Sequence, residues 1–336
     1  MKGLWAILFV FLISSPSYSG EAKPVVAVYP SWKHNKNSIK SIPWARFSHL
    51  AVAGIYPKED GSLHTVDADV FLDELIAASH ANGKKVILSI GGAGEASAGF
   101  LEIGKSQEKR SIFVKKVAAY VEKHNIDGVD IDWEYWTYQS KLNRGGQDAV
   151  ESNQLVLLVK SLRQHFPKPF LLTVDIAPGD WIGEQYSVEL QDHADYVNLM
   201  AFDFTGAWKS SKVGYHSDRS TFKKSLEYVL KRGFNSEKVI VGLPAYGIEF
   251  INGKNSEIRH VDYNEIVEML GRDSKKLAKS KMGDLYFEDR DSIAAKCEWI
   301  NKNKMAGVFI FNILSDHQSE QYSLLASCNK VMPPKN

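Results

Sequence analysis

The chain has 336 residues, of which 44% are hydrophobic and 24% are charged, and its formal net charge is +1. This is the composition of an ordinary globular protein. The near balance of 41 basic and 40 acidic residues argues against nucleic acid or an anionic membrane surface as a partner.

Residues 1–19 are predicted to be a signal peptide. Lys2 supplies the positive charge, residues 4–13 form an unbroken apolar run, and Ser17 and Ser19 fit the small-residue rule for cleavage after Ser19. The run is too short to cross a bilayer comfortably, and no later stretch is apolar enough to do so. We therefore expect a secreted protein, extracellular or periplasmic, in which residues 20–336 form a single domain.

Short apolar runs then alternate with segments of helical pattern. Strands are expected at residues 25–30, 48–55, 86–91, 127–134, 170–176, 195–202, 238–243 and 306–312. Helices are expected at residues 66–82, 107–124, 148–166, 221–232, 292–304 and 319–328, and the stop signals Gly83 and Pro167 follow two of them.

This alternation predicts an α/β fold, a closed (β/α)8 TIM barrel, because apolar β-branched strands between helices are typical of parallel sheets buried on both faces. An open doubly wound sheet is the alternative, but no glycine-rich phosphate loop follows the first strand. Residues 245–291 contain no clear barrel helix, so we expect them to form a modest excursion above the barrel mouth after strand seven.

Residues 127–134 read Asp-Gly-Val-Asp-Ile-Asp-Trp-Glu. Successive side chains of a strand point to opposite faces, so Asp130, Asp132 and Glu134 share one face, about 6.6 Å apart along the strand. Like charges this close resist simultaneous ionisation, so at least one carboxyl should keep its proton at neutral pH and be able to serve as a general acid. The opposite face is apolar and carries Val129, Ile131 and Trp133.

A solvated edge strand is the other interpretation of these acids. The apolar opposite face and the D-x-x-D-x-D-x-E spacing favour a buried strand that lines a site. Active sites of closed barrels lie at the carboxyl ends of the strands. Glu134 ends its strand, so it is expected at the rim, with Asp130 deepest.

This stretch resembles the signature of the family-18 glycoside hydrolases, the chitinases and their relatives. Further similar motifs follow the family's order along the chain: VYPSW at residues 28–32, SIGG at 89–92, MAFD at 200–203, GAW at 206–208, GLPAYG at 242–247 and GVFIF at 307–311. The resemblance covers most of the mature chain.

The resemblance implies hydrolysis of β-1,4-linked N-acetylglucosamine in chitin or chito-oligosaccharides, with retention, by substrate assistance. Glu134 would protonate the glycosidic oxygen, and the sugar's own N-acetyl oxygen would attack the anomeric carbon to give an oxazolinium ion. Asp132 would orient and stabilise that group, and Asp130 would share a proton with Asp132. No metal or other cofactor is implied, and we expect a monomer.

Aromatic residues at or beyond strand ends are candidates to stack on sugar rings, although core packing is an equal alternative for each. They are Tyr29, Trp32, Trp136, Trp181, Trp208 and Phe311. The resemblance also suggests substrate contacts from Met200, Phe202 and Asp203, with loop capping as the alternative for Asp203. Asp127, Ser89 and Gly91 are expected to support the site, Tyr246 is a weaker candidate, and His49 is expected to be a core histidine.

Two positions depart from the family pattern. Phe202 replaces a tyrosine whose hydroxyl holds the N-acetyl oxygen, and Phe311 replaces the tryptophan beneath the scissile sugar. These changes keep other functions open: an endo-N-acetylglucosaminidase, a peptidoglycan hydrolase, or a chitin-binding lectin without activity. Such lectins commonly lack the terminal acid, which is present here as Glu134.

The two cysteines, Cys297 and Cys328, fit an oxidising compartment. They either form a disulfide or remain two buried thiols, and the sequence leaves both possibilities open.

Overall fold

The computed structural model describes residues 23–137, 148–179, 186–208 and 210–335. The predicted signal peptide and Trp181 lie outside the described residues, as does the side chain of Trp136.

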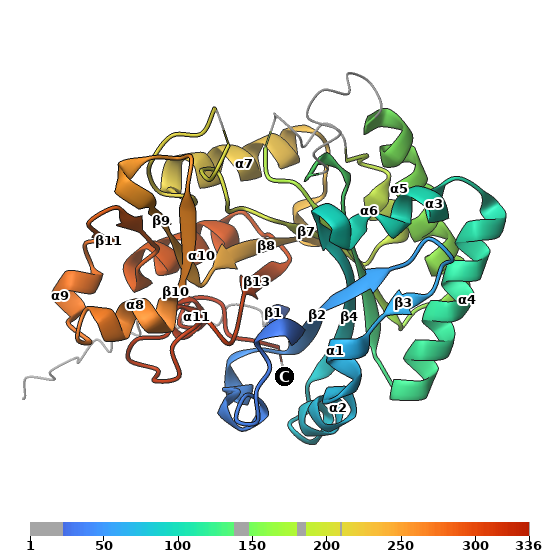
Figure 1. Ribbon diagram of the computed structural model, residues 1–336, viewed down its shortest axis with the longest axis horizontal. Helices are drawn as coiled ribbons and strands as arrows, with labels where there is room; N and C mark the ends of the chain where they lie inside the picture. Colours follow the sequence, from blue (N-terminus) through green and yellow to red (C-terminus); the bar gives the residue numbers. More distant parts are fainter. Residues whose placement is uncertain (1–22, 138–147, 180–185, 209, 336) are drawn as a thin grey trace, which may run out of the picture.

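Eight parallel strands close into a barrel, which confirms the predicted TIM-barrel fold (Figure 1). Strand β1 pairs with β2 on one side and with β13 on the other, so the sheet has no open edge. Around the barrel the strands are β1 (Val25–Pro30), β2 (His49–Pro57), β4 (Lys85–Ala93), β5 (Gly128–Glu134), β6 (Leu171–Ile176), β7 (Tyr196–Leu199), β8 (Val239–Pro244) and β13 (Gly307–Phe311).

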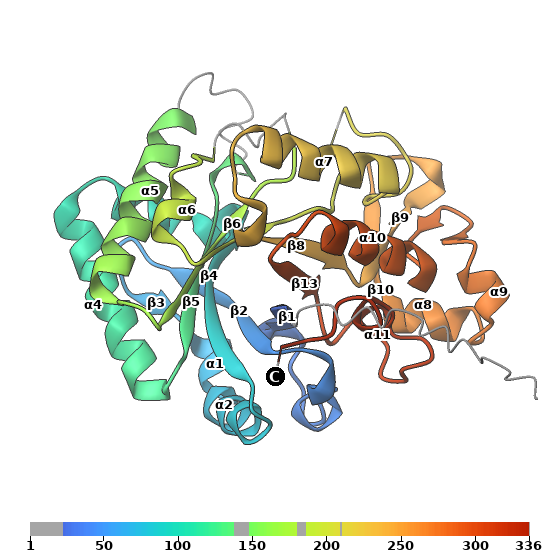
Figure 2. The same ribbon diagram turned by 180° about the vertical axis from the view of Figure 1, so that it is seen from behind.

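Helices surround the outside of the barrel, as two opposite views show (Figures 1 and 2). The α-helices of this layer are α1 (Val66–Asp69), α2 (Leu72–Ala81), α3 (Gly99–Gly104), α4 (Gln107–His124), α5 (Asp148–His165), α6 (Leu190–His193), α7 (Arg219–Lys231), α10 (Arg290–Lys302) and α11 (Leu324–Asn329). Short 3-10 helices are η1 (Ser31–Lys33), η2 (Ile39–Ser41), η3 (Trp44–Arg46), η4 (Gly94–Ser97), η5 (Tyr135–Thr137), η8 (Ser236–Lys238) and η9 (Ile251–Gly253).

Three expected elements differ from the structure. The helix expected at residues 319–328 begins five residues later, as α11 (Leu324–Asn329). The single helix expected at residues 66–82 is divided into α1 and α2 at Phe71, whose backbone is not helical (φ −132°, ψ −6°) and whose ring packs on Tyr29 and His34. Strand β7 ends at Leu199, three residues earlier than expected. The Met-Ala-Phe-Asp motif therefore leaves the sheet and turns towards the barrel mouth.

The segment after strand seven forms a small antiparallel sheet, which confirms the predicted excursion and lies to the left in Figure 1. Its strands are β10 (Ile258–Asp262), β9 (Tyr246–Phe250), β12 (Leu285–Tyr286) and β11 (Lys281–Met282), in that spatial order. Helices α8 (Tyr263–Met269) and α9 (Ser274–Leu277) accompany it, and a separate short strand, β3 (Leu63–His64), extends β2.

Alternation along the strands divides the core into two layers. Side chains that point outward pack under the helices in one large cluster, whereas a smaller apolar cluster lies inside the barrel. The inner cluster consists of Val26, Val28, Ala51, Ile87, Phe202, Ile240 and Phe309. The inner faces of the strands are therefore separated from the main core under the helices, and a site can form there.

Cys297 of α10 and Cys328 of α11 form a disulfide, the first of the two alternatives that the sequence left open. An isolated parallel bridge outside the named strands joins Lys23 to Pro334. None of the helices in the described part of the chain combines the length and apolarity that a bilayer crossing requires.

Candidate active site

The acids of β5 lie on the inner face of the barrel, as the alternation predicted. Val129, Ile131 and Trp133 are fully buried on the outer face. Asp130 is 4% exposed, and Asp132 and Glu134, farther along the strand, are partly exposed. The row therefore runs from the barrel interior to its rim, with Glu134 outermost.

Asp130 accepts three hydrogen bonds from neighbouring strands. The hydroxyl of Ser89 on β4 donates to Oδ2 (2.8 Å), and the hydroxyl of Thr173 on β6 donates to Oδ1 (2.5 Å). Asn198 on β7 also donates to Oδ1 through Nδ2 (3.0 Å). Burial raises the pKa of Asp130, but the three donors oppose this because they stabilise the ionised form. Ser89 thus supports the acid row, as expected.

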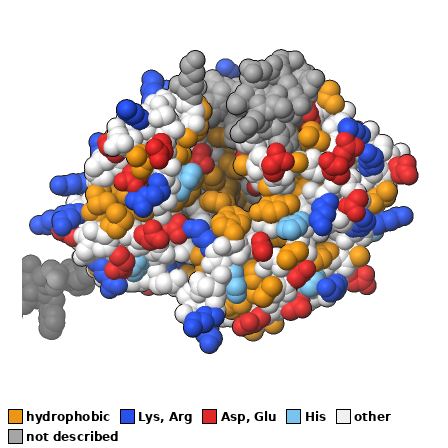
Figure 3. All heavy atoms as spheres, viewed as in Figure 1, with side chains coloured by type: hydrophobic (Ala, Val, Ile, Leu, Met, Phe, Trp, Pro, Cys, Tyr) orange, Lys and Arg blue, Asp and Glu red, His pale blue; other side chains and the backbone are white. Residues whose placement is uncertain are grey.

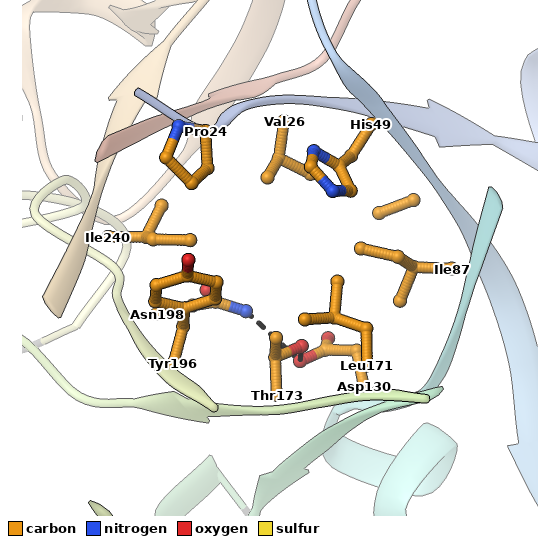
Figure 4. Close-up of a pocket in the computed structure, with 11 residues that line it drawn as sticks. Pro24, Val26, His49, Ile87, Asp130, Leu171, Thr173, Tyr196, Asn198 and Ile240 are labelled. Atoms are coloured by element: carbon orange, nitrogen blue, oxygen red, sulfur yellow. Dashed lines mark hydrogen bonds between the residues drawn. The ribbon is translucent and has the colours of Figure 1, made fainter. Parts of the chain in front are cut away.

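A small cavity lies inside the barrel beside Asp130 (Figure 4). The volume in which the centre of a water molecule can lie is about 20 Å³. This is enough for a single ordered water. Its lining includes His49 and Tyr196, and burial lowers the pKa of His49 to about 4. His49 is therefore neutral at physiological pH and carries no positive charge that could stabilise the ionised acids.

Asp132 has a second acid as its neighbour, Asp175 on β6, which the sequence reasoning missed. The side chain of Asp175 lies within hydrogen-bonding reach of that of Asp132, and this contact opposes the rise in the pKa of Asp132. Burial and the charge of Asp130 raise the pKa of Asp132 to about 8. Burial and the charges of Asp130 and Asp132 hold the pKa of Asp175 well above its usual range. A signal was available, because Thr173 and Asp175 alternate in β6 as the acids do in β5.

Glu134 is held at the rim by its backbone, whose amide donates to the hydroxyl of Ser97 (3.1 Å). Burial raises the pKa of its carboxyl well above the ordinary value, and the charges of Asp132 and Asp203 add to this. Glu134 therefore keeps its proton to higher pH than an exposed glutamate does, which is the state that a general acid needs.

Gly91 permits the close approach of β4 to β5 beside the acids. Its φ is +119°, and a Cβ atom at this position would lie 2.0 Å from the backbone oxygen of Asp132. Only glycine combines this backbone conformation with this space. Its support of the site is thus steric.

Asp203 lies across the mouth from Glu134, in the left-handed backbone region (φ 57°), with its side chain 49% exposed. Its Oδ1 accepts from the hydroxyl of Tyr246 (2.6 Å) and lies 3.2 Å from Nδ1 of the buried His216. Nε2 of His216 lies 3.1 Å from the carbonyl oxygen of Tyr246, and the backbone amide of Asp203 donates to Nδ1 (3.4 Å). Partial desolvation in the mouth alone would raise the pKa of Asp203, but His216 and Tyr246 lower it below the ordinary value.

Aromatic side chains form the remaining wall of the mouth. Phe202 is 8% exposed, and its ring centroid lies 6.0 Å from that of Phe311 and 6.3 Å from that of Tyr246. Trp32 and Trp208 are more open, with 51% and 40% exposure. Met200 is partly buried against the inner cluster. Figure 3 shows a hollow in the centre of this face with hydrophobic side chains on its visible floor.

The structure does not bring Tyr29 to the mouth, which corrects the expected substrate contact. Val26 and Val28 belong to the inner cluster, so alternation directs Tyr29 outward, where it is fully buried and hydrogen-bonds Nδ1 of His34 (2.6 Å). Asp127 also lies apart from the acid row. It precedes β5, and its carboxylate accepts from the backbone amide of Val86 (2.7 Å) and from His80 (2.8 Å), so it fixes the start of two strands.

These observations define a (β/α)8 barrel with a carboxylate site at the carboxyl ends of its strands. No cluster of three or more His, Cys, Asp or Glu side chains within the described ranges is arranged to hold a metal ion. The arrangement of a protonated acid at the rim, a second acid below it and an aromatic wall suits proton transfer to a ligand bound in the mouth.

The sequence matches Glycosyl hydrolases family 18 over residues 25–316, and the chain belongs to this family. Probable chitinase 2 of Drosophila melanogaster is 31% identical over 278 residues, which cover 69% of this chain and 56% of the relative. Human chitinase-3-like protein 2 is 26% identical over 279 residues, which cover 74% and 68%. The match thus spans about half the length of the Drosophila relative.

Two solved structures have the same fold. The chitinase ChiB of Flavobacterium johnsoniae has a TM-score of 0.75 and 25% identity, with 93% of this chain and 94% of that chain covered. Human YKL-39, described as a pseudo-chitinase with retained chitooligosaccharide binding, has a TM-score of 0.76 and 21% identity, with 92% and 99% covered. Proteins with this fold thus include a chitinase and a protein described as a pseudo-chitinase.

Proposed function

We propose that this protein is a secreted, retaining glycosidase that hydrolyses β-1,4-linked N-acetylglucosamine in chitin or chito-oligosaccharides. The observation that carries the proposal is the carboxyl of Glu134, at the rim of the mouth with its pKa held well above the ordinary value. Glu134 acts first as the acid towards the glycosidic oxygen and then as the base towards water.

The nucleophile is the N-acetyl oxygen of the substrate, and Asp132 faces the oxazolinium ion that results. Asp130 supports Asp132 from below, and Asp203, Met200, Phe202, Trp208 and Phe311 contact the sugars. The similarity to the Flavobacterium chitinase ChiB and to probable chitinase 2 of Drosophila supports this substrate class. Export by the predicted leader agrees with the disulfide between Cys297 and Cys328.

Binding without hydrolysis is the second candidate function. It is favoured by Phe202, which brings no hydroxyl to the place where the family pattern has a tyrosine, and by the pseudo-chitinase relative. Losing one hydrogen bond donor in the transition state costs on the order of 10²-fold in rate. That loss slows an enzyme but does not remove its acid.

The test is product analysis with chito-oligosaccharides, peptidoglycan and a high-mannose glycoprotein, for the wild type and for Glu134→Gln. We expect cleavage of chito-oligosaccharides by the wild type, and a loss of about 10²–10⁴-fold in kcat for Glu134→Gln with little change in oligosaccharide affinity. Glu108→Gln, an exposed change on α4, is the matched control. Unchanged turnover of Glu134→Gln would exclude Glu134 as the general acid. Binding of chito-oligosaccharides by the wild type without turnover would establish binding without hydrolysis as the function.

Fully deacetylated chitosan tests the internal nucleophile. Because the attacking oxygen belongs to the N-acetyl group, chitosan should resist cleavage under conditions in which chito-oligosaccharides are hydrolysed. Rapid release of oligomers from chitosan, measured as new reducing ends, would rule out substrate assistance.

A further inference from the structure

Asp175 lies beside Asp132 because of the register between β5 and β6. Asp130 pairs with Thr173 and Ile131 with Val174, so one further step along both strands places Asp132 next to Asp175. Thr173 donates to the inward-pointing Asp130, and alternation directs Asp175 to the same inner face. On its other side, Asp175 pairs with Asn198 of β7.

Both carboxylate oxygens of Asp130 accept hydrogen bonds from other side chains. Ser89 donates to one of its oxygens, and Thr173 and Asn198 donate to the other. Asp132 differs, because no N–H or hydroxyl group among the described residues donates to its buried Oδ1. Its neighbour is the carboxyl of Asp175, and a hydrogen bond between two carboxyl groups requires a proton on one of them.

We propose that Asp175 is a positioning residue that keeps its proton at neutral pH and donates it in a hydrogen bond to Asp132. Asp175 thereby takes the proton-sharing role that the family resemblance assigns to Asp130. The catalytic part of this inference rests on the proposed function. In that setting Asp132 is the member of the pair that ionises first, so that it can accept from the substrate N–H and face the oxazolinium ion. Asp175 keeps its proton, and neither residue makes a bond to carbon.

The surrounding groups determine which carboxyl keeps the proton. Asp130, Asp132 and Glu134 of β5 all face Asp175, and their negative charge raises its pKa in addition to burial. The neighbour on β7 is uncharged: Asn198 hydrogen-bonds Asp175 as well as Asp130. Among the described residues, Asp175 thus faces three acids and no cation, and both its burial and these charges favour its protonated form.

Two substitutions separate the hydrogen bond from the carboxyl itself. Asp175→Asn keeps a donor, because its amide oxygen can accept from Asn198 while its NH₂ group donates to Asp132. Asp175→Ala removes the donor, so the pKa of Asp132 should rise and the acidic limb of the pH profile should move to higher pH. We expect kcat of Asp175→Ala to fall on the order of tenfold or more with KM little changed, and Asp175→Asn to stay within about threefold of the wild type.

The experiment measures kcat and KM against pH with chito-oligosaccharides, together with ¹³C NMR titration of the aspartate carboxyls in the mature chain. The resonances of Asp132 and Asp175 are assigned by their loss in the asparagine variants. Asp291→Asn, an exposed change on α10, is the control, and Asp175→Val, which also lacks a donor but fills more of the space, replaces the alanine variant should that fail to fold.

The result expected is an Asp175 carboxyl still protonated at pH 7 and an Asp132 titration that moves to higher pH in Asp175→Ala. Ionisation of Asp175 at the pH of an ordinary aspartate, or an unchanged Asp132 titration in Asp175→Ala, would overturn the proposal. An inactive wild type would defeat the proposed function, but the two titrations would still decide whether Asp175 donates to Asp132.

Discussion

The inside of the barrel has two walls of opposite character. The polar wall, on β4 to β7, consists of Ser89, Asp130, Asp132, Glu134, Thr173, Asp175 and Asn198. The apolar wall lies mostly on β8, β13, β1 and β2 and consists of Val26, Val28, Ala51, Ile240 and Phe309; Ile87 of β4 belongs to the same cluster, and the neutral His49 of β2 lines the cavity beside it. Both walls belong to one parallel sheet, so the backbone does not distinguish them.

The contrast explains how four carboxyls share one barrel. On the polar wall, hydrogen bonds across strands satisfy the carboxyl of Asp130. The side chains of the apolar wall offer the remaining acids neither a counter-charge nor a hydrogen bond. Because burial also removes most of their hydration, ionisation of these acids is unfavourable and their pKa values rise. Proton retention at Glu134 thus depends on both walls together.

The largest effect is expected from placing an acid on the apolar wall. Phe309→Asp removes a ring that is 6% exposed and adds a carboxyl without a partner, which should cost about 5 kcal/mol or more and prevent stable folding. Phe309→Leu is the matched control, with an expected cost below about 1.5 kcal/mol. Urea unfolding monitored by near-UV circular dichroism makes the measurement. A well-folded aspartate variant of wild-type stability would show that the two walls are interchangeable.

A smaller effect is expected from removing one donor on the polar wall. Thr173→Val keeps the side-chain shape but leaves Oδ1 of Asp130 without its shortest hydrogen bond, which should lower the free energy of unfolding at pH 7 by about 1.5–3 kcal/mol. Thr65→Val removes the same kind of bond, to Asp69, at an exposed site, and should cost much less. Equal losses in the two variants would contradict a special role of burial.

Adding a hydroxyl to the aromatic part of the mouth should raise activity. If the missing tyrosine hydroxyl limits the proposed reaction, Phe202→Tyr increases kcat on chito-oligosaccharides by about tenfold. Phe309→Tyr, at a neighbouring ring of the same cluster, controls for the added oxygen. A flat or reduced rate for Phe202→Tyr would indicate that the mouth is adapted to a different ligand.

The smallest effect concerns stability and pH. The pKa of Asp132 is raised from 3.8 to about 8, so folding favours its protonated form. This contribution is fully present below about pH 4 and is lost as the pH rises towards 8. Asp132→Asn cannot ionise, so its melting temperature should exceed that of the wild type by about 2–5 °C at pH 8 but not at pH 4. Parallel melting curves of both proteins from pH 4 to pH 9 would contradict the raised pKa.

The barrel fold and the row of acids on β5 can be predicted from the sequence, because both follow from patterns within short segments. Alternation within β5 is enough to place Asp130, Asp132 and Glu134 on one face with Glu134 at the rim. The spacing of apolar strands between helices is enough to indicate the closed barrel and the excursion after strand seven. The same rule, applied from Val26 and Val28, would also have directed Tyr29 away from the mouth.

The tertiary structure alone decided which polar groups meet. The contact of Asp132 with Asp175 depends on the register of β5 against β6, and that of Asp203 with His216 depends on how the chain turns after β7. Neither contact can be predicted from a single strand, because the register between strands depends on the packing of all eight strands together. The sequence by itself places Glu134 where it can transfer a proton to a ligand. The assembled barrel determines which neighbouring carboxyls keep their protons.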